Sequence, residues 1–279
     1  MSSDQSQASR VEQEKLKLQG FREEFIAGVP SWYRGEAQVA ILLLLPAGTI
    51  YYCWNHIAGA TWIEWAMVVP VFLVGNFAEW AAHRYVLHGN VRGFKLAFRR
   101  HTGVHHHFFT QHNMLFKGHK EWLAQLFPPY AVVAFIVIGI PPALIVGYLW
   151  SANAGYVIEG MFAANYLVYE FLHSVSHMDD ARHPYLKHIP LVNSVRRMHR
   201  VHHNLRYMQT HNFNLTFPIA DAIMGTSDLE RGLIGTLFNG ENETSVQKDP
   251  RLEEEPPQFA DWGTDESSFR QFGKAAKTG

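Results

Sequence analysis

Residues 61–88 read TWIEWAMVVPVFLVGNFAEWAAHRYVLH, a long apolar run that ends in two histidines. The part up to Ala82 is as long as the ~20-residue helix that crosses a bilayer. Directly after it, His83 and His88 form the pattern HxxxxH. The sequence therefore predicts a membrane-spanning helix that carries histidines at one end.

Three other segments are long and apolar enough to span a membrane, namely residues 37–54, 127–150 and 155–172. No lysine or arginine occurs between residues 35 and 83, or between residues 121 and 181. Only short turns separate the members of each pair. We therefore expect an all-α integral membrane protein with about four transmembrane helices in two hairpins.

Two pairs of prolines complicate the third span. Pro128 and Pro129 lie at its start, and Pro141 and Pro142 lie inside it. Proline removes a backbone donor and kinks or breaks a helix. A re-entrant pair of half-helices is therefore an alternative there, and buried core helices of a soluble protein are the alternative for all four segments.

The positive charges between the two hairpins predict the orientation. The turns at residues 55–60 and 151–155 carry no lysine or arginine, and positively charged loops stay on the cytoplasmic side. Because two crossings separate the ends of the second and fourth spans, both ends emerge on the same side. We expect a cytoplasmic helical cap on a protein of the bacterial inner membrane or the endoplasmic reticulum. The charges between the hairpins are Arg84, Arg92, Lys95, Arg99, Arg100, Lys117 and Lys120.

Histidine is the residue type that stands out in composition. The chain has 17 histidines in 279 residues, and all except His56 lie between His83 and His211. Four patterned clusters follow the spans, in the order HxxxxH, HxxxHH, HxxxH and HxxHH. The clustered histidines are His83, His88, His101, His105, His106, His107, His173, His177, His199, His202 and His203.

Helical spacing predicts which of these rings lie together. Residues four apart share a helix face, so we expect His101 to pair with His105 and His173 with His177. Adjacent histidines point ~100° apart on a helix. The neighbours of the last cluster, HxxHH, therefore suit two different metal ions better than one.

The first cluster does not fit an ideal helix. His83 and His88 are five residues apart, and an α-helix does not align such a pair. The pair requires a helix end, a π-bulge or two separate metals.

About ten candidate ligands exceed the four of a structural zinc site. We therefore expect a dinuclear centre, and imidazole suits iron, zinc, copper or nickel. A centre with open positions on two redox metals can bind O2. Isolated histidines such as His56, His183 and His188 are interpreted as surface or packing residues.

The order of the clusters, interleaved with two membrane hairpins, resembles the fatty acid hydroxylase and sterol desaturase superfamily of membrane-bound di-iron oxygenases. The segment from Asn212 to Thr226, NFNLTFPIADAIMGT, resembles the segment after the last cluster in that family, and the likeness covers about residues 75–226. The resemblance implies O2-dependent hydroxylation or desaturation of a lipid at two iron ions, with zinc as a possible replacement in purified protein. By motif match the ligands would be His83, His88, His101, His105, His106, His173, His177, His199, His202 and His203.

The second cluster departs from the HxxHH of many family members. Its sequence is HxxxHH followed by His107, so His106 with His107 is an alternative to His105 with His106. Polar residues near the clusters are candidates to hold the ligands from behind, because metal-bound histidine often donates its other N–H to such a group. These candidates are Glu79 and Glu170, with Asn204, Asn212 and Asp221 as weaker ones.

The chain is expected to need a separate electron donor, which could be cytochrome b5, a ferredoxin or a reductase. It contains neither the His-Pro-Gly-Gly haem motif nor GxGxxG. The net charge of −1 and the absence of a basic stripe exclude nucleic acid as an expected partner. A lipid desaturase or sterol oxidase of the same superfamily is one rival function. A membrane metal-binding or transport protein is another.

Three regions are expected along the chain. Residues 1–35 would form a cytoplasmic segment with a short helix that starts at a capping box of Ser9 and Glu12. Residues 36–240 would form the membrane-embedded domain. Residues 241–279, which are polar and contain three prolines, would form a tail.

Overall fold

The computed structural model describes residues 3–179 and 181–227, and this part of the chain is all-helical without a β-strand. The expected fold class is confirmed at that level. The expected tail, residues 241–279, lies outside the described residues. The α-helices are α1 (Ser3–Gly28), α2 (Gly35–His56), α3 (Trp62–Ala66), α4 (Val68–Ala81), α5 (Lys95–Phe98), α6 (His106–Phe108), α7 (Trp122–Gln125), α8 (Pro129–Leu149), α9 (Ala152–Ser176), α10 (Val192–His202) and α11 (Ile219–Met224). The other helical turns are η1 (Ala82–Leu87), η2 (Arg99–His105), η3 (His119–Glu121) and η4 (Leu186–His188).

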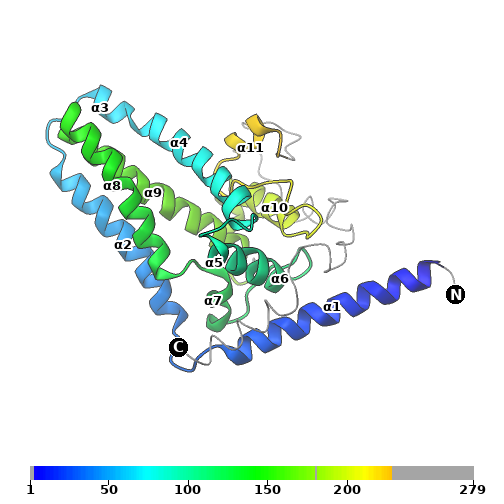
Figure 1. The fold of residues 1–279 in the computed structure, drawn as a ribbon. Coiled ribbons are helices and arrows are strands. Elements are labelled where there is room, and N and C mark those ends of the chain that lie inside the picture. Colours follow the sequence, from blue (N-terminus) through cyan, green and yellow to red (C-terminus); the bar gives the residue numbers. More distant parts are fainter. Residues whose placement is uncertain (1–2, 180, 228–279) are drawn as a thin grey trace.

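The long helices α2, α4, α8 and α9 lie side by side in one bundle (Figure 1). Three segments are long and apolar enough to cross a membrane, Gly35–His56, Trp62–Leu87 and Pro129–Leu149. Their outward side chains are apolar: Leu44 is 71% exposed and Leu144 is 67% exposed. Apolar side chains on the outside of a bundle indicate contact with lipid rather than water.

The helix α9 covers the fourth expected span but is not among these three candidates. It is 25 residues long, packs against α2, α4 and α8, and buries more residues than any of them. Its polar side chains contact other helices. Asn165 lies so close to Gly75 of α4 that a Cβ at Gly75 would clash with it. An inner helix does not need to be apolar on every side, which explains its lower hydropathy.

The third expected span is one unbroken helix. Pro129 occupies its first turn, where proline leaves no hydrogen bond unmade. Pro141 and Pro142 lie inside α8, and the helix continues through them to Leu149. The re-entrant alternative is therefore not the one adopted.

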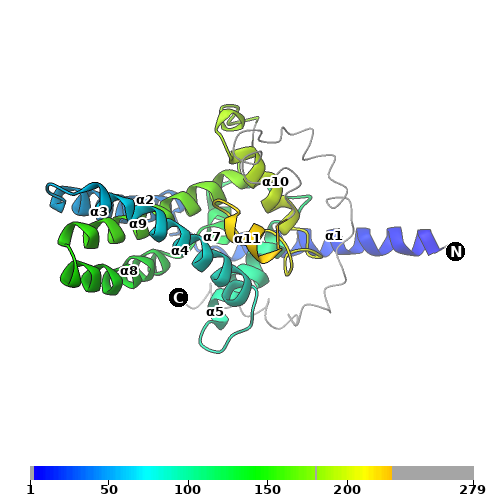
Figure 2. The ribbon, with the colours of Figure 1, turned by 90° about the horizontal axis from the view of Figure 1, so that it is seen from above.

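Both hairpin turns meet at one end of the bundle, which we call the far end. The backbone N–H of Ala58 donates to Asn153 Oδ1 at 3.1 Å, and Asn153 Nδ2 donates to the Ala58 carbonyl at 3.0 Å. Glu64, in a capping box with Thr61, also accepts a hydrogen bond from Ser151. The opposite end of the bundle, the histidine end, carries the short helices α5, α7, α10 and α11 (Figure 2).

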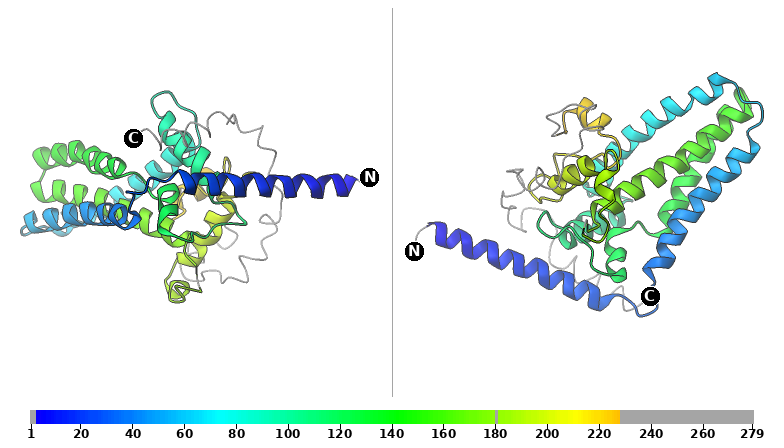
Figure 3. Two further views of the ribbon diagram at one scale, coloured as in Figure 1. Left: turned by 90° about the horizontal axis from the view of Figure 1, so that it is seen from below. Right: turned by 180° about the vertical axis from the view of Figure 1, so that it is seen from behind.

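The N-terminal helix α1 extends away from the bundle at the histidine end (Figure 3). It begins at Ser3, so the expected helix start at Ser9 is wrong, because Ser9 lies within the helix. A buried ion pair between Arg22 and Glu121 at 2.8 Å fixes its second half to the short helices. Arg22 also lies 4.5 Å from the centre of the Phe108 ring.

Candidate metal centre

The first histidine pair is aligned by a π-helical turn. In η1 the backbone N–H of His88 donates to the carbonyl of His83 at 3.1 Å, a bond across five residues. Such a turn holds one residue more than an α-helical turn. The rings of His83 and His88 therefore stack with their centres 5.1 Å apart. A π-bulge was one of the three arrangements expected for this spacing.

A second π-helical turn adds a neighbour to the expected pair in the next cluster. In η2 the N–H of His106 donates to the carbonyl of His101, again across five residues. The Nε2 atoms of His101 and His106 lie 3.1 Å apart. The rings of His101 and His105 stack as expected, with their centres 5.2 Å apart, and the wider turn brings His106 to His101 as well.

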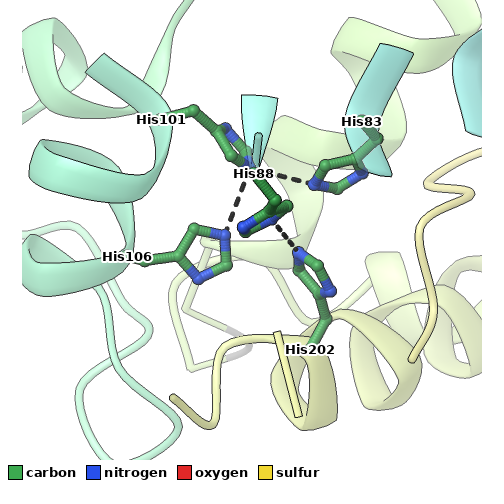
Figure 4. A group of neighbouring side chains, drawn as sticks. All are labelled: His83, His88, His101, His106 and His202. Atoms are coloured by element: carbon green, nitrogen blue, oxygen red, sulfur yellow. Dashed lines mark hydrogen bonds between the residues drawn. The ribbon is translucent and has the colours of Figure 1, made fainter. Parts of the chain in front are cut away.

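Nine histidines form two adjoining groups in which the ring nitrogens converge. Within each group the candidate ligand atoms all lie within 4.8 Å of one another, and every member is buried. The first histidine group is His83, His88, His101, His106 and His202, shown in Figure 4. The second histidine group is His105, His177, His199 and His203.

Neighbours in sequence belong to different groups, as the ~100° step of a helix predicts. His202 lies in the first group and His203 in the second. Likewise, His106 lies in the first group and His105 in the second. His173, which also belongs to the expected ligand set, is in neither group, but its Nε2 lies 3.2 Å from Nε2 of His105.

In five of the nine rings a backbone carbonyl fixes which nitrogen carries the proton. A carbonyl only accepts, so a ring nitrogen bonded to one must be the N–H of a neutral imidazole. Nδ1 of His83 donates to Phe213 O at 2.5 Å, and Nδ1 of His202 donates to His211 O at 2.7 Å. The same arrangement holds in the second group for His105 with Ala124 O, His177 with Met114 O and His203 with Phe109 O.

In His88 a hydroxyl group fixes which ring nitrogen carries the proton. Thr102 Oγ1 donates to Leu87 O at 2.7 Å, so its lone pairs are free to accept from His88 Nδ1 at 3.1 Å. Thr102 is fully buried. The remaining nitrogen of His88, Nε2, therefore has no proton and presents its lone pair to the first group.

The converging nitrogens fit metal ions better than one another. Nε2 of His88 and Nε2 of His202 lie 3.0 Å apart although both are unprotonated, which places two lone pairs face to face. Nε2 atoms of His177 and His199, and of His199 and His203, are also 3.0 Å apart. Two nitrogens that each bind one ion at ~2.0–2.1 Å at nearly a right angle are separated by about this distance. The donor set therefore fits a pair of transition metals.

Burial keeps these imidazoles neutral. It lowers the pKa of His177 to about 3, and burial together with the neighbouring His203 lowers the pKa of His199 well below its ordinary value. A neutral imidazole is the form that binds a metal ion. The groups are therefore in the metal-binding form at neutral pH.

The alternative register, His106 with His107, is not the one in which the rings converge. His107 points to the other side of its helix, where Nδ1 donates to Thr102 O at 2.8 Å. Its ring lies edge-on to Phe21 of α1. His107 therefore belongs to the packing between α1 and the short helices.

Glu79 was predicted to hold a histidine ligand from behind, but its carboxylate accepts hydrogen bonds from the segment after the last cluster. Its oxygens accept from the N–H groups of Leu215 and Thr216 at 2.5 and 3.1 Å and from the Thr216 hydroxyl. Asp221 braces the same segment, since it accepts from the N–H of Phe213 and of Asn214. Both carboxylates hold in place the chain whose Phe213 carbonyl anchors His83.

The remaining polar candidates lie near the groups and contact a tyrosine or the backbone. Glu170, one turn before His173, is buried with Oε2 3.4 Å from the Tyr166 hydroxyl. Asn204 follows His203 and accepts from the N–H of Arg206. Asn212 donates from its side chain to the carbonyl of Met198. These contacts support the backbone around the histidines.

Sequence reasoning missed Thr102 and the anchoring carbonyls of Phe109, Met114, Ala124 and Phe213. Every residue has a carbonyl, so no sequence signal distinguishes an anchoring one. Thr102 lies between His101 and His105 in the sequence. Its place in the cluster is a signal that could have found it.

A cavity of about 590 Å³ leads to both groups at the histidine end. Its walls include His101 of the first group, His105 of the second and His173. Most other wall residues are apolar, among them Phe25, Phe94, Leu96, Val104, Leu126 and Phe127.

Comparison with known families gives one match: the sequence model of the family described as fatty acid hydroxylase covers residues 68–226. The matched region is more than half of the chain, and it contains every member of both histidine groups. No curated protein and no solved structure matches the chain.

Proposed function

The chain belongs to the fatty acid hydroxylase family, and from this premise we propose that it binds two iron ions in the two histidine groups and uses O2 to hydroxylate a lipid. One observation carries the proposal. Nine buried histidines converge with their ring nitrogens in two adjoining groups, which would supply four or five ligands to each ion. Two redox metals held by these groups would supply the oxidising power for a C–H bond.

The residues of the chain would hold, orient and shield this centre. The carbonyls behind Nδ1 keep five of the nine rings in one tautomer, which also raises the basicity of the ligand nitrogen. The buried rings of Phe109 and Phe213 pack against the histidines and exclude water from them. An enclosed site of this kind protects reactive species from side reactions.

The cavity supports a lipid as the substrate. Its walls are mainly apolar, and it ends at histidines of both groups. Its walls include Tyr33, just before α2, and Tyr130, in the first turn of α8. A hydrocarbon chain could therefore enter from the membrane without crossing bulk water.

We propose four membrane crossings, with α9 as the fourth, and a cytoplasmic histidine end. The joined turns at the far end carry no lysine or arginine, whereas the segment between the hairpins carries seven. Positive charge on the cytoplasmic side supports this orientation. The separate electron donor would then act on the cytoplasmic side.

A desaturase or oxidase of the same superfamily would use the same centre, and analysis of the product distinguishes these reactions. Metal transport finds less support, since transport sites lie near the middle of the membrane. Here the groups lie at the ends of the apolar segments, and eight of their nine members fall outside the three candidate spans.

The test compares lipids from cells with and without the chain by mass spectrometry. A lipid that gains one oxygen atom supports hydroxylation, and one that loses two hydrogens supports desaturation. His202→Ala serves as the matched control, because it removes one ring from the first group. Identical lipid profiles with wild type and His202→Ala, in cells that supply iron and electrons, would overturn the proposal.

A further inference from the structure

One charged side chain lines the otherwise mainly apolar cavity. Arg100 lies in η2, one residue before His101, and its Nη2 donates to the carbonyl of Leu123 at 3.2 Å. In the part of the chain that the structure describes, the single ion pair joins Arg22 and Glu121. Arg100 therefore has no carboxylate within 4.0 Å among the described residues.

This arginine is costly unless something pairs with its charge. A guanidinium stays protonated in proteins, and a partly buried charge without a counter-ion is destabilising. The phenols of Tyr33 and Tyr130, which also line the cavity, are the side chains that interact with it electrostatically. Among the described residues, the cavity wall contains no aspartate or glutamate that could balance the charge of Arg100.

We propose that Arg100 binds the anionic head group of the lipid whose hydrocarbon chain fills the cavity. This inference rests on the proposed function, because it takes the cavity as the substrate site. The shared chemistry of the ligand is a carboxylate or phosphate on an acyl chain. The planar fork of arginine binds either group through two parallel hydrogen bonds.

The position of Arg100 also restricts which carbons are oxidised. Its guanidinium binds the carbonyl of Leu123, and His105 of the second group binds the next carbonyl, that of Ala124, at 3.1 Å. Two neighbouring carbonyls in a helical turn thus hold the head-group site and a candidate metal ligand. Oxidation therefore falls in the half of the chain nearer the head group.

The size of the cavity is consistent with a single-chain ligand. Its volume of about 590 Å³ lies inside the ~300–1,000 Å³ range of small-molecule sites. A whole two-chain lipid would have to leave its second chain outside. The head group at Arg100 and one chain along the apolar wall use the space that the structure provides.

The test measures binding of tritiated palmitate and tritiated 1-hexadecanol to the full chain in non-ionic detergent, with a scintillation proximity assay. The two probes have equally long chains and differ in head-group charge. Wild type should bind palmitate about 10- to 100-fold more tightly, the range expected for a charge-assisted hydrogen-bonded pair. Arg100→Gln should lose this preference.

Arg99→Gln is the matched control, because Arg99 is the neighbouring residue, is exposed and does not line the cavity. It should keep the preference of wild type. Arg100→Lys keeps the charge without the fork, so part of the preference should remain. An unchanged elution volume and metal content for each variant show that it is folded.

Competition identifies the source of the head group. Displacement of palmitate by phosphatidylglycerol but not phosphatidylcholine supports an anionic phospholipid, and displacement by neither supports a free acid. Equal binding of palmitate to wild type and Arg100→Gln would overturn the inference. Because binding requires neither O2 nor turnover, this failure is distinct from the absence of an oxidised lipid, which would overturn the proposed function alone.

Discussion

Replacing Thr102 by valine should weaken metal binding in the first histidine group without changing a ligand. The Thr102 hydroxyl accepts from His88 Nδ1 at 3.1 Å and donates to Leu87 O at 2.7 Å. Valine has nearly the same shape but no hydroxyl. The backbone carbonyl of residue 102, which accepts from His107, is unaffected.

The loss of metal affinity depends on which tautomer His88 adopts in the valine variant. If Nδ1 keeps its proton, a buried donor is left without an acceptor, at a cost of about 1–3 kcal/mol. If the proton moves to Nε2, the lone pair that faces His202 is lost and the group has one ligand fewer. Since 1.4 kcal/mol is a factor of ten, we expect affinity for one metal ion to fall about 10- to 100-fold, as for other partners behind metal ligands.

The assay is elemental analysis of protein dialysed against buffers of graded free metal concentration. Wild type should retain two ions per chain, and Thr102→Val should lose one of them at about 10- to 100-fold higher free metal. Thr102→Ser restores the hydroxyl and should behave as wild type. If the valine variant and wild type lose both ions at the same free metal concentration, the proposed role of Thr102 and of the His88 tautomer is refuted.

Three further predictions test the centre and its placement. His202→Ala should abolish the oxidised lipid in mass spectra, whereas His56→Ala, at the far end, should leave it unchanged. Burial lowers the pKa of His107 to about 4, below the ~6.5 of a histidine in an unfolded chain. As the pH falls, the unfolded state therefore takes up this proton first. The unfolding temperature should consequently fall between pH 7 and pH 5. An unfolding temperature that stays constant between pH 7 and pH 5 would contradict this prediction. Asn214, buried and bonded to Asn76, should carry no glycan in a eukaryotic cell in either orientation. The acceptor site at Asn242, outside the described residues, should also stay bare, and a glycan there would invert the proposed orientation.

The apolar helices could be predicted because lipid leaves few alternatives. A backbone in the membrane must satisfy its hydrogen bonds within the segment, so charge-free runs near 20 residues become helices. Residues 37–54 and 127–150 accordingly correspond to α2 and α8. The helix α9 shows the limit of the rule, since its polar side chains contact other helices and its hydropathy alone does not mark it as a span.

The histidine clusters could be predicted, but their pairing could not. Spacing of four residues predicted that His101 and His105 lie together, and their rings do stack, but it did not predict that a π-helical turn places His106 with His101 in one group. Such a turn gives up regular hydrogen bonds and is stabilised by packing around it. The residues of the segment RRHTGVH have no conformational preference that predicts a π-helical turn. His101 and His106 are five residues apart, like His83 and His88, and this shared spacing was the signal in the sequence for a second π-helical turn.

The two π-helical turns and the two adjacent pairs together explain why the groups form one centre. The pairs His105–His106 and His202–His203 each supply one ring to each group. Rotation of α10 or of η2 about its own axis would therefore withdraw ligands from both groups at once. With α-helical geometry in η2, His106 would turn away from His101 and the first group would lose a ring. The π-helical turn of η2 thus places His106 in the first group, while the ordinary helical step places His105 and His203 in the second.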